Sequence, residues 1–83
     1  MTDFDFSAPA DIFASPRMGM SKSAIKYHRF GSAAEAIRFV METLPAQMLG
    51  GTVMEVGNDR FTGAEIRRLY DDEAFPLPRA RVS

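Results

Sequence analysis

The clearest pattern of apolar and polar positions is an amphipathic helix that begins at Ser32. Ser32 and Glu35 have the spacing of a capping box, in which each side chain accepts a hydrogen bond from a backbone amide at the helix start. Because Pro45 disfavours helical backbone at the residue before it, we expect the helix to end at Leu44, or to kink into one more turn over residues 46–49 before the glycines at 50 and 51. Apolar residues recur between these ends at the spacing of one helical face: Ile37, Val40, Met41 and Leu44.

A second helix is predicted after residue 61 by signals that agree on one boundary. Thr62 and Glu65 form another capping box, and Phe61 and Ile66 have the spacing of a hydrophobic staple across the helix start. The acidic run that follows Tyr70 is unfavourable at a helix C-terminus, so we expect the helix to end there.

Alternating side chains predict a strand over residues 23–30. Ile25 and Tyr27 alternate with Lys26 and His28, which is the period of a half-buried strand. We expect Ile25 and Tyr27 on the core face and the basic side chains on the opposite face.

Residues 52–56 predict a second strand because they are rich in β-branched side chains. Met54 and Val56 share one face of this strand and are expected to point inward. The turn residues at 57–59 then favour a hairpin with a very short third strand at residues 60–61.

The two ends of the chain show no sustained periodicity. Residues 1–22 are interpreted as a mostly disordered arm and residues 78–83 as a flexible basic tail. Phe4, Phe6 and Phe13 are unusual in such an arm, because disordered segments are normally poor in aromatic residues. Two interpretations are open: the arm folds back over its own domain, or it docks on another molecule.

Taken in order, these elements predict a single α+β domain of order β-α-β-β-α over residues 23–77. Two helices are expected on one face of a short sheet, with flexible termini on both sides. The expected core consists of Ile25, Tyr27, Phe30, Ile37, Val40, Met41, Leu44, Met54, Val56, Phe61, Ile66, Leu69 and Tyr70.

Three runs within residues 28–79, FGSAAEAIRFVMETLP, VMEVGNDRFTGAEIRRLYD and FPLPR, carry a resemblance. Together they resemble a group of small bacterial proteins of unknown function. The resemblance implies a compact bacterial domain, assigns no catalytic or binding residue and leaves the N-terminal arm unmatched.

Composition removes most enzymatic chemistry. The chain has no cysteine and a single histidine, His28, so neither a thiolate nucleophile nor a clustered metal site is predicted. Glycine-rich phosphate-binding motifs are also missing from the sequence. We therefore predict a protein that is not an enzyme, with no catalytic residue, cofactor, metal or small-molecule ligand.

Hydropathy and charge predict where in the cell the protein is found. No apolar run approaches the roughly 18 residues of a membrane span. The first residues carry aspartates where a signal peptide needs lysine or arginine. A cytoplasmic protein without a membrane partner is expected.

A formal net charge of -1 argues against a dedicated nucleic-acid-binding protein, whose footprint is normally basic. Basic residues do gather locally, since residues 16–30 hold several bases and no acid. Weak nucleic-acid binding is therefore the alternative function, with candidate contacts at Lys22, Lys26, Arg29, Arg60 and Arg67.

The leading hypothesis is a small interaction or regulatory module that binds another protein or a second copy of itself. It rests on size: if the arm is disordered, only about 60 residues remain to bury a core, and a domain this small often gains further burial from a partner. The expected places of contact are a short exposed strand edge and Phe39, whose ring falls on the polar side of the first helix, where either a neighbouring segment covers it or a partner does. The candidate protein contacts are Phe39, Phe4, Phe6 and Phe13.

Overall fold

The sheet is the frame of the molecule. A computed structural model describes residues 4–15 and 25–78, and it contains a four-stranded antiparallel sheet of strand order β2-β1-β3-β4. Its strands are β1 (Ala10–Ala14), β2 (Lys26–Phe30), β3 (Val53–Val56) and β4 (Asp59–Thr62). The helices are α1 (Ala33–Arg38), a π-helical segment (Phe39–Thr43), a 3₁₀ helix (Ala46–Gly51) and α2 (Gly63–Asp71). The predicted α+β class is confirmed, and the expected order gains one strand at its N-terminal side.

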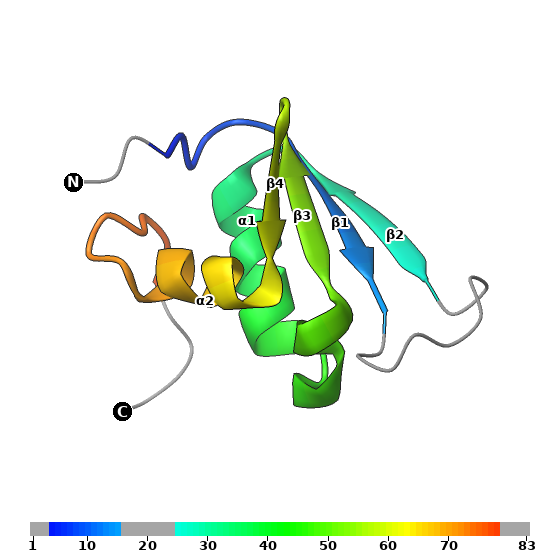
Figure 1. The fold of residues 1–83 in the computed structure, drawn as a ribbon. Coiled ribbons are helices and arrows are strands. Elements are labelled where there is room, and N and C mark those ends of the chain that lie inside the picture. The colour runs from blue at the N-terminus through cyan, green and yellow to red at the C-terminus, as the bar shows by residue number, and fades with distance from the viewer. Residues whose placement is uncertain (1–3, 16–24, 79–83) are drawn as a thin grey trace.

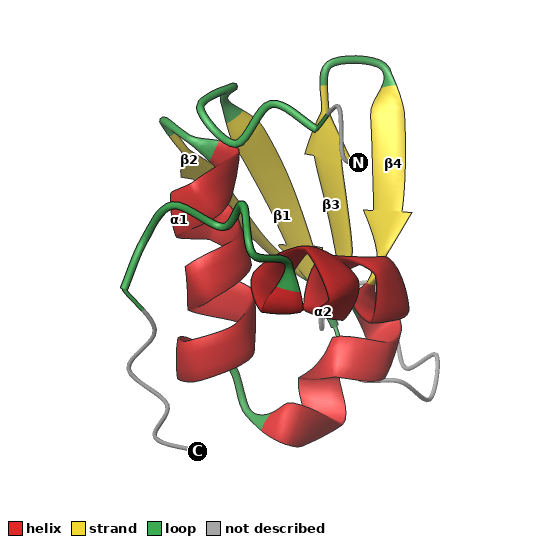
Figure 2. Cartoon of the chain, turned by 90° about the vertical axis from the view of Figure 1, so that its left-hand side faces the viewer, coloured by secondary structure: helices red, strands yellow, loops and turns green. Residues whose placement is uncertain are grey.

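The helices lie on one side of the sheet (Figures 1 and 2). α1 crosses over β1 and β2, and α2 begins directly after β4. The buried apolar side chains fill the layer between helices and sheet: Ala10, Ile12, Ala14, Ala33, Ala34, Ala36, Ile37, Val40, Met54, Ile66, Tyr70 and Phe75. Within this layer the Tyr70 hydroxyl donates a hydrogen bond to the Glu42 carboxylate, which ties α2 to the π-helical segment.

Both predicted helix starts are confirmed. At α2 the Thr62 hydroxyl accepts from the Glu65 amide at 3.4 Å, and the Glu65 carboxylate accepts from the Thr62 amide at 2.9 Å, which completes the capping box. At α1 the Ser32 hydroxyl accepts from the Glu35 amide at 3.2 Å. These caps fix where each helix leaves the sheet.

Removal of the Thr62 hydroxyl should weaken α2. The Thr62→Ala variant is expected to lose about 1 kcal/mol of unfolding free energy, because the Glu65 amide loses its capping acceptor. Thr62→Ser keeps the hydroxyl and should stay within about 0.5 kcal/mol of the parent. Urea denaturation followed by circular dichroism measures both, and equal losses in the two variants would contradict a capping role.

The first helix changes its winding before it ends. From Phe39 onward the backbone is π-helical, and the Leu44 amide bonds to the Phe39 carbonyl at 3.1 Å, a spacing of five residues. Leu44 itself is extended ahead of Pro45, as predicted from the proline. Phe39, the first residue of this segment, packs on the Phe30 ring at 5.2 Å between centroids. A side chain of β2 therefore covers Phe39, as expected if a neighbouring segment of the same chain, and not a partner, buries this ring.

The interpretation of residues 1–22 as a mostly disordered arm is wrong for the part that the structure describes. β1 lies in the middle of the sheet, between β2 and β3, with Ile12 fully buried. Ahead of the strand, Phe4 packs edge-on against Phe61 at 5.2 Å, and Phe6 packs against Phe75 at 5.9 Å. These contacts confirm the fold-back interpretation for Phe4 and Phe6, while residues 1–3 and 16–24, including Lys22, lie outside the described residues.

The expected register of β2 is also wrong. Ile25 and Tyr27 are 49% and 54% exposed, so neither belongs to the core. Phe30 packs against the core as predicted, and it is His28 that shares its face, because side chains alternate along a strand. The reason is the entry into α1: Phe30 lies two residues before the cap at Ser32 and must face the helix layer.

Candidate binding surface

The sheet face opposite the helices carries a row of apolar side chains. The strand register places Tyr27 of β2 beside Phe13 of β1, Phe13 beside Val53 of β3, and Val53 beside Thr62 of β4. The Phe13 and Tyr27 rings lie 5.3 Å apart between centroids. We call Tyr27, Phe13, Val53 and Thr62 the apolar row, and Ile25 extends it at the start of β2. Among the described residues, none covers this face (Figure 1).

A row of charged side chains runs across the same face, two residues along each strand from the apolar row. It consists of Arg29, Asp11, Glu55 and Arg60, from β2, β1, β3 and β4 in that order. We call these four residues the charged row. Its two acids are direct cross-strand neighbours in the centre, and an arginine stands at each end.

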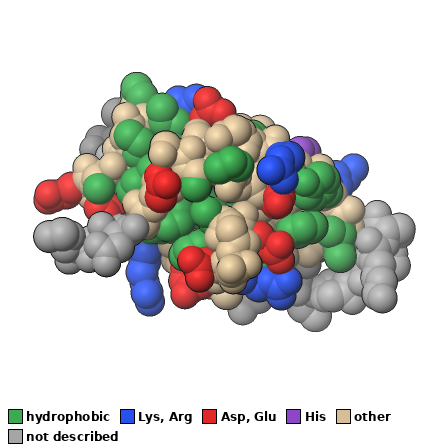
Figure 3. Space-filling view, turned by 90° about the horizontal axis from the view of Figure 1, so that it is seen from above, with side chains coloured by type: hydrophobic (Ala, Val, Ile, Leu, Met, Phe, Trp, Pro, Cys, Tyr) green, Lys and Arg blue, Asp and Glu red, His purple; other side chains and the backbone are tan. Residues whose placement is uncertain are grey.

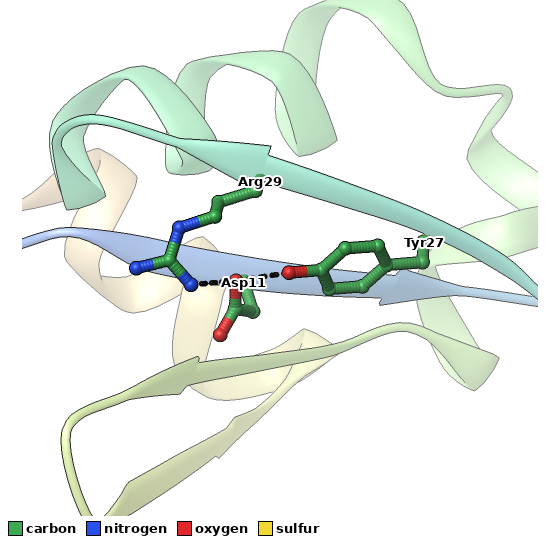
Figure 4. A network of polar contacts seen from close by, with 3 residues as sticks. All are labelled: Asp11, Tyr27 and Arg29. Atoms are coloured by element: carbon green, nitrogen blue, oxygen red, sulfur yellow. Dashed lines mark hydrogen bonds and ion pairs between the residues drawn. The ribbon is translucent and has the colours of Figure 1, made fainter.

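Each acid of the charged row is bound by the arginine beside it. Asp11 accepts from the Arg29 guanidinium at 2.9 Å and from the Tyr27 hydroxyl at 2.7 Å (Figure 4). Glu55 accepts from Arg60 at 2.7 Å. Hydrogen bonding with the Tyr27 side chain, followed by the charge of Asp11, raises the pKa of Arg29. Each arginine thus neutralises one of the two central acids, which reduces the repulsion between them, and the row is neutral as a whole.

The free edge of β2 borders a second aromatic cluster, on the helix side of the sheet. The His28 ring lies 4.7 Å from the Phe39 ring, and Phe39 lies 5.2 Å from Phe30. A hollow of about 270 Å³ opens beside these rings. It is lined by Phe30, Glu35, Arg38, Phe39, Glu42 and Thr43.

The candidate nucleic-acid contacts do not meet on one surface. Arg29 and Arg60 lie on the open face but at opposite edges of the sheet, each paired with an acid. Lys26 lies on the other face of β2, the one that faces the helices, because it pairs with the buried Ala14. Arg67 lies on α2, where it lines a groove of about 570 Å³ against the 3₁₀ helix.

The candidate protein contacts are also separated. Phe4 and Phe6 are half-buried against the chain's own core, and Phe39 is half-buried beneath β2 side chains. Only Phe13 of the four lies on the open face, where it contacts Tyr27. Tyr27 and Ile25 are not predicted as contact residues from the sequence, because its alternation places both side chains in the core.

One signal in the sequence points to the open face. Phe30 cannot share a face with Tyr27 on a regular strand, and its position ahead of the Ser32 cap commits it to the helix side. Given that constraint, Tyr27 must face away from the helices. An exposed aromatic on a strand is then a candidate contact residue.

The described residues show neither a metal site nor a membrane-spanning helix. Within residues 4–15 and 25–78, no three histidine, cysteine or acidic side chains come together as a metal site. No helix in the described part of the chain has the length and apolar character needed to cross a bilayer.

Comparisons of the chain with protein-family models, with curated proteins and with solved structures found no match. The resemblance of residues 28–79 to a group of small bacterial proteins stays a prediction. The open sheet face, with its apolar and charged rows, is therefore the feature on which a functional proposal has to rest.

Proposed function

We propose that this chain is a non-catalytic interaction module that binds another protein through the open face of its sheet. The observation that carries the proposal is the apolar row, in which an exposed Tyr27 and a half-buried Phe13 lie side by side with no described element over them. A surface of this kind exposes apolar area to water that a partner would bury.

The composition of the face supports a protein partner. The centres of protein interfaces are enriched in tyrosine, phenylalanine and arginine, and their rims are polar. Here Tyr27 and Phe13 lie beside a charged row whose acids and arginines already balance. Figure 3 shows acidic and basic side chains interspersed over the upper surface of the molecule, without a field of one sign.

The size of the face supports a partner other than a second copy packed sheet on sheet. Strands lie about 4.8 Å apart and rise about 3.3 Å per residue, so four short strands present roughly 300 Å². A stable protein interface buries about 800 Å² on each partner. Contact with the open face alone is too small, so the partner must also reach over an edge of the sheet.

A paired substitution on the apolar row tests this proposal. The Phe13→Thr/Tyr27→Thr double variant keeps β-forming residues but removes both rings, and Gln47→Ala on the exposed 3₁₀ helix is the matched surface control. Each tagged full chain is used to capture proteins from native cell extract, with and without nuclease treatment. We expect proteins that bind the parent and Gln47→Ala to be lost from the double variant, with circular dichroism unchanged.

The proposal fails if all three proteins retain the same binding partners. It also fails if every captured partner disappears after nuclease treatment, because the contacts would then run through nucleic acid.

Single-stranded nucleic acid is a second candidate, favoured by one observation. The adjacent Phe13 and Tyr27 rings offer a stacking surface for unpaired bases, and Arg29 shares their face. The acids Asp11 and Glu55 oppose it, since they neutralise the two arginines of that face. A gel shift with single-stranded probes at low salt that weakens steeply as salt rises would support this candidate.

A further inference from the structure

We infer that the free edge of β2 binds an extended acidic segment of a partner protein, which adds to the sheet as a fifth strand. The inference rests on the proposed function, because it specifies the kind of partner and the way in which that partner reaches beyond the open face. It is carried by three features of β2: an unpaired backbone edge, apolar side chains on both sides of that edge, and an unbalanced positive charge.

The backbone of β2 is paired on one side only. β2 is the outermost strand of the sheet order and pairs with β1 across all five of its residues, Lys26–Phe30. On its other side no described strand or helix takes its hydrogen bonds. An edge strand of this kind presents alternate amide and carbonyl groups that a further strand can pair with.

Apolar surface lies on both sides of this edge. Toward the open face the edge presents Ile25 and Tyr27, the only strongly exposed large hydrophobic side chains among the described residues. Toward the helices it presents Phe30 and Phe39, beside the hollow of about 270 Å³. Side chains of an added strand alternate between the two faces, so one set would contact Tyr27 and the other would reach the hollow.

Charge selects the composition of the added strand. β2 carries Lys26 and Arg29 and no acid, while Arg29 already shares Asp11. A second copy of β2 offers no acid to pair with Lys26, so self-pairing leaves this charge unbalanced. A segment with an acidic residue beside apolar ones is complementary, with the acid opposite Lys26. Lys26 lies on the helix side of β2, four residues before Phe30, so the acid belongs at that end of the added strand. In the hollow beside Phe30, Arg38 is accompanied by Glu35 and Glu42, so apolar or uncharged side chains suit the other end.

The opposite edge of the sheet, β4, is also outermost but lacks the apolar and charge features of β2. β4 has four residues, and its Asp59 and Arg60 carry opposite charges, with Arg60 held by Glu55. Its inward ring, Phe61, is already packed by Phe4. The two edges therefore serve as an internal comparison in one molecule.

The test uses the full chain and a displayed library of random linear peptides. We expect selection to enrich peptides that combine an acidic residue near one end with apolar residues at both odd and even positions, so that apolar side chains reach both faces of the sheet. Synthetic versions of an enriched peptide are then made with N-methyl groups at every second residue, in the two possible phases. Only alternate amides of a strand point at its neighbour, so one phase should weaken binding at least about tenfold and the other should leave it nearly unchanged.

Two protein variants and one exchange measurement locate the site. Lys26→Glu should weaken the peptide at least about tenfold, whereas Arg67→Glu, the same change of net charge on α2, should leave affinity within about twofold. Bound peptide should slow amide hydrogen exchange in Lys26–Phe30 and leave Asp59–Thr62 at its free rate.

Several outcomes would overturn the inference: no enriched peptide, equal effects of the two N-methyl phases, protection at β4 instead of β2, or a dimer whose contact protects β2. Failure here is distinguishable from failure of the proposed function. If peptides do not pair with β2 but captured proteins still depend on Phe13 and Tyr27, the open face remains the binding surface and only the strand addition is lost.

Discussion

The Ile12→Ala variant is expected to lose about 3 kcal/mol of unfolding free energy. Ile12 is fully buried at the centre of the sheet, opposite His28 on one side and Met54 on the other. Truncation removes buried methyl groups and leaves a cavity between sheet and helices, which costs about 2 to 5 kcal/mol. A chain of this length has only about 4 to 12 kcal/mol of total stability. Urea denaturation followed by far-ultraviolet circular dichroism measures the loss as a lower midpoint at constant slope.

Ile25→Ala is the matched control for this substitution. The same atoms are removed from a side chain that is 49% exposed, so the expected loss is at most about 0.5 kcal/mol. The sequence-based interpretation predicts the reverse order, because it placed Ile25 in the core and Ile12 in a disordered arm. An Ile25 variant that loses more stability than the Ile12 variant would contradict the observed sheet.

The helix boundaries could be predicted from sequence because their signals are local. A hydroxyl at the cap and a glutamate three residues later determine a hydrogen-bonding pattern that needs no distant contact. The full capping box is present at Thr62, and its hydroxyl half is present at Ser32. The same holds for the turn after β3, where Gly57 has a φ of 60° that glycine adopts without strain.

The central strand could not be recognised with the same ease. β1 is only five residues long, and it lies between Pro9 and Pro16 in a segment of mixed composition. Its alternation is present, with Ala10, Ile12 and Ala14 buried, but two of these are alanines that carry a weak hydrophobic signal. Strand formation here depends on pairing with β2 and β3, which is distant in sequence.

The error at β1 also reversed β2 and hid the candidate site. The alternation of β2 alone predicts Lys26 and His28 on the solvent face and Tyr27 in the core. With β1 in place, Asp11 lies on the open face and accepts from both Tyr27 and Arg29. A candidate surface assembled from four strands depends on register, and a shift of one residue exchanges the two faces of a strand.

The Gly63→Ala variant is expected to lose about 2 to 3 kcal/mol of unfolding free energy. This is the opposite of the usual effect, because alanine normally stabilises a helix relative to glycine. Gly63 is the first residue of α2 and is buried. A Cβ atom there would lie 2.1 Å from the carbonyl oxygen of Leu49, well inside the contact distance, so α2 and the 3₁₀ helix would have to move apart. This overpacking outweighs the gain of about 1 kcal/mol that alanine brings in an open helix. Urea denaturation measures the loss, and an unchanged or raised stability would contradict the close approach of the two helices.

Two other glycines separate the close contact from backbone effects. Gly31→Ala should change stability by no more than about 0.5 kcal/mol, because nothing lies within 4 Å of its added Cβ. Gly57→Ala should lose about 1 kcal/mol, since space is open there but the φ of 60° is strained for alanine. The expected order of loss is therefore Gly63, Gly57, Gly31. If Gly63→Ala ranked with Gly31→Ala, the packing of α2 on the 3₁₀ helix would be looser than described. The groove that contains Arg67 would then lack a rigid wall.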